Sequence, residues 1–171
     1  MKSFLLLTIA ATTMLFARGQ DDKSKRPSPP AQAKETISNG TVVTIDYSQP
    51  SVKGRTIGKD LEPMPGKVWR TGANEATTFE VSKPVKVEGK ELPAGKYALF
   101  TIANDNEWTI IFNKTAKQWG AYDYKEADDA LRVKVKPAKA AQFTEKMTFS
   151  VNKNGTVSLL WGDTKVDFTV S

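Results

Sequence analysis

The chain has 171 residues and contains neither histidine nor cysteine, which excludes several classes of protein chemistry. Without imidazole or thiol groups it lacks the ligands of most zinc and copper sites, the Ser-His-Asp triad, thiol nucleophiles and disulfides. Its 25 basic and 19 acidic residues give a net charge of +6, but the lysines alternate with acids and form no basic stripe with stacking aromatics. We therefore expect no nucleic-acid partner.

The first 19 residues have the layout of a secretory signal peptide. Lys2 precedes an apolar run from Phe4 to about Phe16, and the small residues Ala17 and Gly19 follow it. The run is shorter than the roughly 20 residues that span a bilayer, and we expect no transmembrane segment elsewhere; a buried amphipathic first helix is the alternative. Cleavage is expected after Gly19, or else after Ala17. Because no cysteine is present to carry a lipid, we expect a periplasmic or secreted protein that is not a lipoprotein.

Residues 20–30, "QDDKSKRPSPP", are charged and proline-rich and predict a flexible tether. Over residues 31–171 apolar residues recur with period two, and glycine, proline or asparagine interrupts them about every 8–12 residues. This pattern predicts an all-β, single-domain antiparallel β-sandwich of roughly nine or ten strands. The one expected helix is a turn around Lys125 to Ala130, and a strand from Leu131 to Pro137 follows it.

Two short hairpins are predicted to turn at Asn39-Gly40 and at Glu88-Gly89. A third, in "YALFTIANDNEWTIIFN", closes through a three-residue loop at 104–106, which places Ile102 opposite Trp108. Both faces of this third hairpin are largely apolar. We therefore expect it near the centre of a sheet, with something covering each side.

Two more turns are predicted near the C-terminal end of the sequence. A three-residue loop at 153–155, with its glycine in the left-handed conformation, pairs Val151 with Val157. A two-residue turn at Gly162-Asp163 folds the last segment back so that its apolar residues share one face. Trp161, which precedes this turn, is assigned to the core, as is Trp108.

The segment "VWRTGANEAT" is the strongest candidate for a site, because it places a polar cluster directly after a tryptophan. Arg70 offers a guanidinium fork suited to a carboxylate or phosphate, and Asn74 and Glu75 can accept and orient a ligand. Gly72 removes bulk where the chain turns or a ligand approaches. Two interpretations stay open: a ligand clamp that includes Trp69, or a brace in which Arg70 pairs with Glu75 or a nearby Asp and pins the loop against Trp69.

Four further residues are candidates for ligand binding. Lys53 and Arg55 lie on a long connection with proline and glycine, which is either a basic loop beside a ligand or an irregular crossover between sheets. Trp119 and Tyr122 flank Gly120 and present aromatic rings that stack on sugars; core or sheet-edge packing is the alternative.

No complete catalytic signature is present. A carboxylate-based glycosidase would need two acids at defined separations, and the spacing does not show which acids meet. The oxygen-rich "NDNEW" resembles a calcium loop but is explained more simply as a hairpin turn. We therefore predict no catalytic residue, metal site or cofactor, and the acids considered for catalysis are Asp46, Glu75, Asp123 and Glu126.

Several segments together resemble one bacterial family. They include "VTIDYSQPSVKGRTIG", "GKVWRTGANEATT", "LPAGKYALFTI", "EWTIIFNK" and "QWGAYDY". The chain is similar to the family filed as domain of unknown function 2911, found mostly in exported proteins of the Bacteroidetes kind, over nearly all of its length from Ser28. The resemblance implies an exported all-β domain and no established reaction, so it assigns no catalytic residue. The family's motif falls on Trp69, Arg70, Thr71, Gly72, Asn74 and Glu75.

The function that these features favour is binding of a small polar, anionic or glycan ligand near the "WRTGANE" loop. A structural or assembly role, in which the domain contacts an envelope protein through a sheet edge or apolar patch, is the alternative. Hydrolysis by carboxylates alone is the third hypothesis. The partners of the Arg70 guanidinium distinguish the clamp from the brace.

Overall fold

Residues 22–171, the part of the chain that the computed structural model describes, form eleven β-strands and two single-turn 3-10 helices. The expected signal peptide lies outside the described residues. Within them, no helix has the length and apolar character needed to cross a membrane. In chain order the elements are η1 (Lys23–Lys25), β1 (Pro30–Thr36), β2 (Val42–Ser48), β3 (Val68–Trp69), β4 (Thr78–Val81), β5 (Val85–Val87), β6 (Lys90–Leu92), β7 (Gly95–Ala103), β8 (Trp108–Asn113), η2 (Glu126–Asp128), β9 (Asp129–Val135), β10 (Pro137–Val151) and β11 (Thr156–Thr169).

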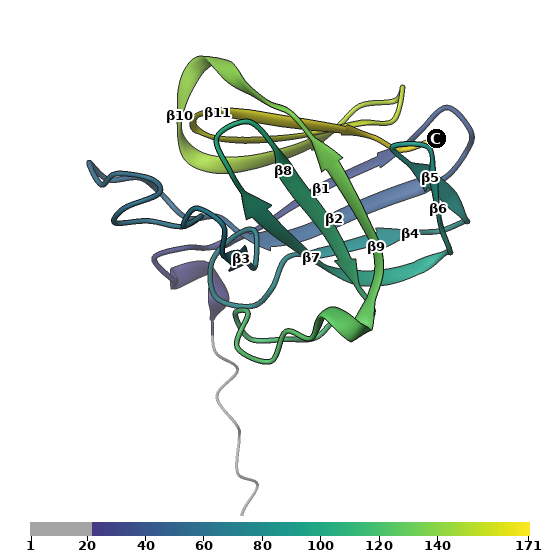
Figure 1. The fold of residues 1–171 in the computed structure, drawn as a ribbon, viewed down its shortest axis with the longest axis horizontal. Coiled ribbons are helices and arrows are strands. Elements are labelled where there is room, and N and C mark those ends of the chain that lie inside the picture. The colour runs from purple at the N-terminus through teal and green to yellow at the C-terminus, as the bar shows by residue number, and fades with distance from the viewer. Residues whose placement is uncertain (1–21) are drawn as a thin grey trace, which may run out of the picture.

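Most strands belong to one antiparallel sheet in the order β1-β2-β4-β7-β8-β9, with the short β3 also paired to β7. β10 and β11 form a separate long hairpin, which lies across one side of the sheet (Figure 1). β5 and β6 form a third, small hairpin. The all-β antiparallel class is therefore as predicted. Eleven strands replace the expected nine or ten in part because β3 has only two residues, too few to show alternation.

The main hydrophobic core lies between the sheet and the β10–β11 hairpin. Phe79 of β4 and Phe112 of β8 pack edge to face with ring centroids 5.0 Å apart, and both contact Phe168 of β11. Trp108 and Trp161 belong to the same cluster, which confirms their assignment to the core. Burial of large side chains from two layers provides the main driving force for this fold.

β7 and β8 are apolar on both faces and lie in the interior of the sheet, as predicted. Their second face carries a smaller cluster that includes Phe100 and Ile111. The connection between β8 and β9 covers it, and Tyr124 of that connection packs against Phe100 with ring centroids 4.9 Å apart. The connection between β8 and β9 therefore lies close to the "WRTGANE" loop.

The predicted register of this hairpin is wrong by one residue. Trp108 pairs with Ala103, not with Ile102, because the loop contains four residues and is closed by a hydrogen bond from the Asn104 amide to the Glu107 carbonyl. Apolar alternation fixes register only where one face is buried and the other is polar. Here both faces are apolar, so the pattern did not distinguish a three-residue loop from a four-residue one.

The predicted turn between β10 and β11 is confirmed, with Val151 opposite Val157 and Gly155 at a φ of 87°. The predicted turn at Gly162-Asp163 is wrong. β11 runs through both residues and stays paired with β10, and Gly162 faces Thr144 at a register shift. A glycine at positive φ serves a bulge as well as a turn, and Gly162, at φ 60°, is used for the bulge.

Other local predictions are confirmed. The β5–β6 hairpin turns at Glu88-Gly89, whose φ values of 49° and 78° are both positive, as in a type I′ turn. β1 and β2 form a hairpin around Asn39-Gly40. The helical turn predicted around Lys125 to Ala130 is η2, but it ends at Asp128, and β9 begins at Asp129, two residues before the predicted strand. The N-cap residue Lys125 makes no side-chain capping hydrogen bond.

Residues 22–30, which belong to the segment predicted to be a tether, contact the rest of the domain. Pro30 already belongs to β1 and pairs with Ser48, and the Pro29 carbonyl accepts a hydrogen bond from the Gln49 amide. Asp22 caps η1 through its side chain. The segment therefore runs along the end of β2, next to the "WRTGANE" loop.

Candidate functional site

Hydrogen bonds between its two ends hold the loop from Trp69 to Thr77 in one conformation. The Thr77 amide donates to the Arg70 carbonyl at 3.1 Å, and the Thr77 hydroxyl donates to the Thr71 carbonyl at 2.7 Å. Thr71 is fully buried at a φ of 54°, and its hydroxyl lies 3.2 Å from that of Thr101 on β7. Positive φ is strained for a β-branched residue, and such strain concentrates at functional loops.

Gly72 lets this loop lie directly against the end of β2. A Cβ at this position would lie 3.0 Å from the Ser48 carbonyl oxygen and 3.0 Å from the Thr77 hydroxyl, closer than side chains normally approach. The Gly72 carbonyl accepts the indole N–H of Trp69 at 3.1 Å, and the Ala73 amide donates to Ser48 at 3.2 Å. The glycine is therefore required by close packing of the loop against the end of β2.

A cavity of about 200 Å³ lies beside this loop. The first wall comes from the loop itself, the second from the connection between β2 and β3, the third from β11, and the fourth from the segment before β1. The residues that line it are Ser28, Pro50, Arg55, Leu61, Glu62, Trp69, Arg70, Gly72, Ala73 and Trp161.

Arg70 lines the cavity, and its side chain has no hydrogen-bond or ion-pair partner among residues 22–171. Its Nε is buried and has no hydrogen-bond partner, and its guanidinium makes no ion pair with any residue in the described range. Glu75, the expected bracing partner, instead binds Lys23 and Arg26, with Glu75 Oε1 2.9 Å from Lys23 Nζ and Oε2 3.0 Å from Arg26 Nη1. A buried donor without an acceptor is costly, and within residues 22–171 no group offsets that cost for Arg70 Nε.

The two other basic candidates lie differently. Arg55 lines the same cavity, and its Nε and Nη2 donate to the carbonyls of Val52 and Ser51 at 3.1 and 2.8 Å, which fixes the direction of its head group. Lys53 is exposed and does not line the cavity; only its backbone amide is bonded, to the Glu145 carboxylate. The structure thus brings Arg55, and not Lys53, to Arg70.

Two residues that sequence reasoning did not assign to the site also line the cavity. Glu62 lies on the connection between β2 and β3, and its Oε2 accepts the Met64 amide at 2.6 Å. Trp161 of β11 donates its indole N–H to the Glu62 carbonyl at 2.8 Å. Glu62 precedes a proline in a segment without alternation, so no local pattern indicated that it meets a strand almost 100 positions later.

Asn74 and Glu75 do not line this cavity but hold one of its walls. The Asn74 side chain donates to the Ser28 carbonyl at 3.0 Å, and Ser28 lines the cavity. Partial burial alone raises the pKa of Glu75, but hydrogen bonds from Lys23, from its own backbone amide and from Arg26 outweigh it and lower the pKa to about 2. The two residues therefore anchor the segment before β1.

Trp119 and Tyr122 lie beside the loop but outside the cavity. A β-bridge joins Glu75 to Trp119, so the two segments that were candidates for binding do meet through their backbones. The Trp119 and Tyr122 side chains are 55% and 82% exposed. The ring of Tyr122 lies over Gly120, where a Cβ would come within 2.8 Å of it. These rings form an exposed surface, not a wall of the cavity.

A family model described as a protein of unknown function, DUF2911, matches residues 28–170, nearly the whole described chain. The chain belongs to this family. No curated protein matches it, and no solved structure does. The DUF2911 match confirms the family resemblance and assigns no chemistry to the domain.

Two of the acids considered for catalysis line a second cavity of about 240 Å³ in this DUF2911 domain. Asp46 accepts from Gln32 at 2.7 Å and lies 3.3 Å from Lys96 Nζ, and Glu75 is paired as described above. Glycosidases need one carboxyl with a raised pKa as the proton donor, whereas the pKa of Glu75 is lowered to about 2. Glu75 therefore does not supply that donor. In residues 22–171 no group of three acids is arranged to hold a metal ion.

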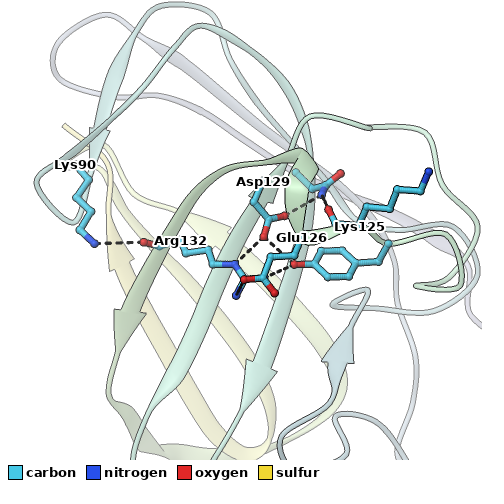
Figure 2. A network of polar contacts seen from close by, with 7 residues as sticks. Lys90, Lys125, Glu126, Asp129 and Arg132 are labelled. Atoms are coloured by element: carbon cyan, nitrogen blue, oxygen red, sulfur yellow. Dashed lines mark hydrogen bonds and ion pairs between the residues drawn. The ribbon is translucent and has the colours of Figure 1, made fainter.

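A separate polar network of the DUF2911 domain lies at the start of β9 (Figure 2). Arg132 Nε donates to Asp129 at 2.6 Å, and the Tyr124 hydroxyl donates to the same carboxylate at 2.7 Å. Asn113 donates to the other oxygen of Asp129 at 2.8 Å. Burial and the hydrogen bond to Asp129 raise the pKa of Tyr124 to about 12. Because its members satisfy one another, the network fixes the connection that covers β7 and β8.

Proposed function

We propose that the protein is an exported binding domain that holds a small anionic ligand against Arg70. The observation that carries the proposal is the buried Nε of Arg70, which has no acceptor and lies at a cavity of about 200 Å³. Leaving a buried donor unpaired costs about 1–3 kcal/mol. A ligand oxygen that accepts from this group would remove that cost, and this gain would appear as affinity.

Carboxylate is the group that suits this cavity. A guanidinium forms two parallel hydrogen bonds with a carboxylate, and this geometry is both strong and specific. Arg55 adds a second positive charge to the same wall, with its orientation fixed by backbone carbonyls. The volume is below the roughly 300–1,000 Å³ of sites for drug-sized ligands, so the ligand is a small molecule or a single terminal group.

The rigidity of the loop supports a binding role. Arg70 is followed by the strained, buried Thr71 and the closely packed Gly72. Hydrogen bonds between the two ends of the loop hold this segment in place. A site that is fixed in its bound conformation loses less entropy when the ligand arrives. The strain at Thr71 is consistent with selection for the position of Arg70 and not for loop stability alone.

Titration with small anions tests the proposal. Protein that has been unfolded, dialysed and refolded should give saturable heats or NMR shift changes with at least one of acetate, succinate, phosphate and glucuronate. Acetamide, which is neutral, should give none. Arg70→Met should abolish the response, and Lys53→Met should leave it unchanged because Lys53 is exposed and outside the cavity. Binding that survives in Arg70→Met, or no binding by any small carboxylate or anion, including amino acids, would refute the proposal.

A second candidate function is glycan binding on the exposed rings of Trp119 and Tyr122, which are unusual among the large side chains of this domain for their exposure. Aromatic rings with a free face stack on sugars. Envelope polysaccharides should quench tryptophan fluorescence in the natural protein and not in Trp119→Ala. Unchanged fluorescence with every polysaccharide would remove this candidate.

Export is part of the proposal because residues 1–19 have the layout of a signal peptide. The mature protein isolated from the native cell should begin at Gln20, or at Arg18 if cleavage follows Ala17. A mature protein that keeps Met1 would contradict export by this route.

A further inference from the structure

The cavity beside the "WRTGANE" loop contains charges of both signs that do not pair with each other. Glu62, Arg55 and Arg70 all line it. Among residues 22–171, Glu62 makes no ion pair or hydrogen bond with either arginine; its one side-chain hydrogen bond is from the Met64 amide to Oε2. Opposite charges that share so small a volume attract strongly, yet these are held beyond contact distance.

The surrounding bonds explain why the charges stay apart. Glu62 is fixed on one side of the cavity because Met64 binds its carboxylate and Trp161 binds its carbonyl at 2.8 Å. Arg55 is fixed by the carbonyls of Ser51 and Val52. Arg70 is part of the loop closed by Thr77. Each group is positioned by its own segment, so the lining of the cavity includes an anionic residue and two cationic residues that do not pair.

Aromatic side chains line the same cavity as the charged groups. Trp69 and Trp161 both line the cavity, and each has its indole N–H bonded to a backbone carbonyl, of Gly72 and Glu62 respectively. Indole faces attract ammonium groups as well as apolar surface. A ligand with a cationic group near Glu62 would therefore gain from the carboxylate and from the adjacent rings.

We propose that the ligand is a small zwitterion, an α-amino acid whose carboxylate binds Arg70 and whose ammonium group binds Glu62. This inference rests on the proposed function, because it takes the anionic end of the ligand to lie against Arg70. The volume of about 200 Å³ is suited to a single amino acid and not to a long peptide. Two arginines against one glutamate leave the lining with an excess positive charge, so acidic side chains are favoured over basic ones.

Three small ligands that differ in their charged groups test the inference without any mutation. Alanine carries both charged groups, propionate lacks the ammonium group, and ethylamine lacks the carboxylate. Refolded, dialysed protein should bind alanine at least about tenfold more tightly than propionate, because a charge-assisted hydrogen bond contributes at least about one factor of ten. Ethylamine should bind least. Aspartate should bind more tightly than lysine.

Two variants then test which residue binds the ammonium group of the ligand and which binds its carboxylate. Glu62→Gln should reduce alanine affinity to that of propionate and leave propionate affinity the same or higher, because the amide keeps an oxygen for the Met64 N–H but loses the charge. Arg70→Met should abolish binding of both ligands. Lys53→Met is the matched control that should change neither.

The outcomes separate this inference from the function on which it rests. Equal affinity for alanine and propionate, with both lost in Arg70→Met, would overturn the zwitterion and leave the anion site standing. No saturable binding of either ligand or of any other small anion would overturn both. Alanine binding that is unchanged in a folded Glu62→Gln variant, as judged by circular dichroism, would also overturn the zwitterion.

Discussion

Replacing Arg70 with methionine should make the ligand-free protein more stable, which is the reverse of what replacing a bracing arginine would do. The buried Nε of Arg70 has lost its water and gained no acceptor. Methionine keeps an unbranched apolar chain and removes the donor. The free energy of unfolding should therefore rise by the cost of one unsatisfied buried donor, about 1–3 kcal/mol.

Arg132 is the matched control, because it is an arginine whose donors are used. Its Nε binds Asp129 at 2.6 Å, and the Asp129 side chain is only 8% exposed. Removing the guanidinium leaves that carboxylate with fewer donors, so Arg132→Met should lower the free energy of unfolding by about 1.5–3 kcal/mol. The ion pair with the exposed Glu126 adds little to this loss.

Urea denaturation followed by circular dichroism measures both changes. With an m-value of about 2 kcal/mol/M, the unfolding midpoint should rise by about 0.5–1.5 M in Arg70→Met and fall by a similar amount in Arg132→Met. The natural protein must be refolded and dialysed first, because a retained ligand would stabilise it and hide the gain. Two variants that lose stability to the same degree would show that Arg70 is a brace, and the proposed anion site would lose its main support.

Two further predictions concern the N-terminal segment and the β10–β11 turn. Because the folded pKa of Glu75 is lowered to about 2 from an ordinary 4.5, its ion pair contributes stability that is present above about pH 4.5 and is lost as the pH falls through 2. An NMR titration of the Glu75 carboxyl should therefore have a midpoint near 2 that moves upward in Lys23→Met; a midpoint near 4.5 in the natural protein would contradict the contact. Gly155→Ala should cost about 1–3 kcal/mol more than Gly89→Ala in urea denaturation. Both glycines have positive φ, but only at Gly155 would a Cβ meet backbone, 1.9 Å from the Val170 oxygen. Equal losses would show that this turn does not contact the end of the chain as described.

Sequence reasoning succeeded where the structure is decided within a few residues. The turn at Glu88-Gly89 and the loop that ends at Gly155 follow from local backbone chemistry, and both form as predicted. At Gly162 the local sequence was compatible with both a turn and a bulge. A Cβ there would come within 2.6 Å of Ile57, so this glycine serves a close approach by a distant segment as well as a bulge. The residues next to Gly162 in the sequence do not indicate that approach.

The candidate site, too, could be predicted from the sequence only in part. The unusual loop around Arg70 was evident from its composition, but the opposite side of the cavity comes from Glu62 and Trp161, which are far from it in sequence. Trp161 was assigned to the core on its alternation, and it is indeed buried there. A buried residue that also lines a cavity gives the same sequence pattern as one that does not, so alternation alone cannot identify it.

The two charged residues of the "WRTGANE" motif, Arg70 and Glu75, do not pair with each other. Arg70 and Glu75 are close in sequence and opposite in charge, and a brace between them would satisfy both. Lys23 and Arg26 occupy the Glu75 carboxylate instead. The segment before β1 therefore does two things: it supplies Ser28 to the cavity wall, and it removes the acid that would otherwise neutralise Arg70. On this reasoning the segment is part of the proposed binding site, and the availability of the Arg70 guanidinium depends on it.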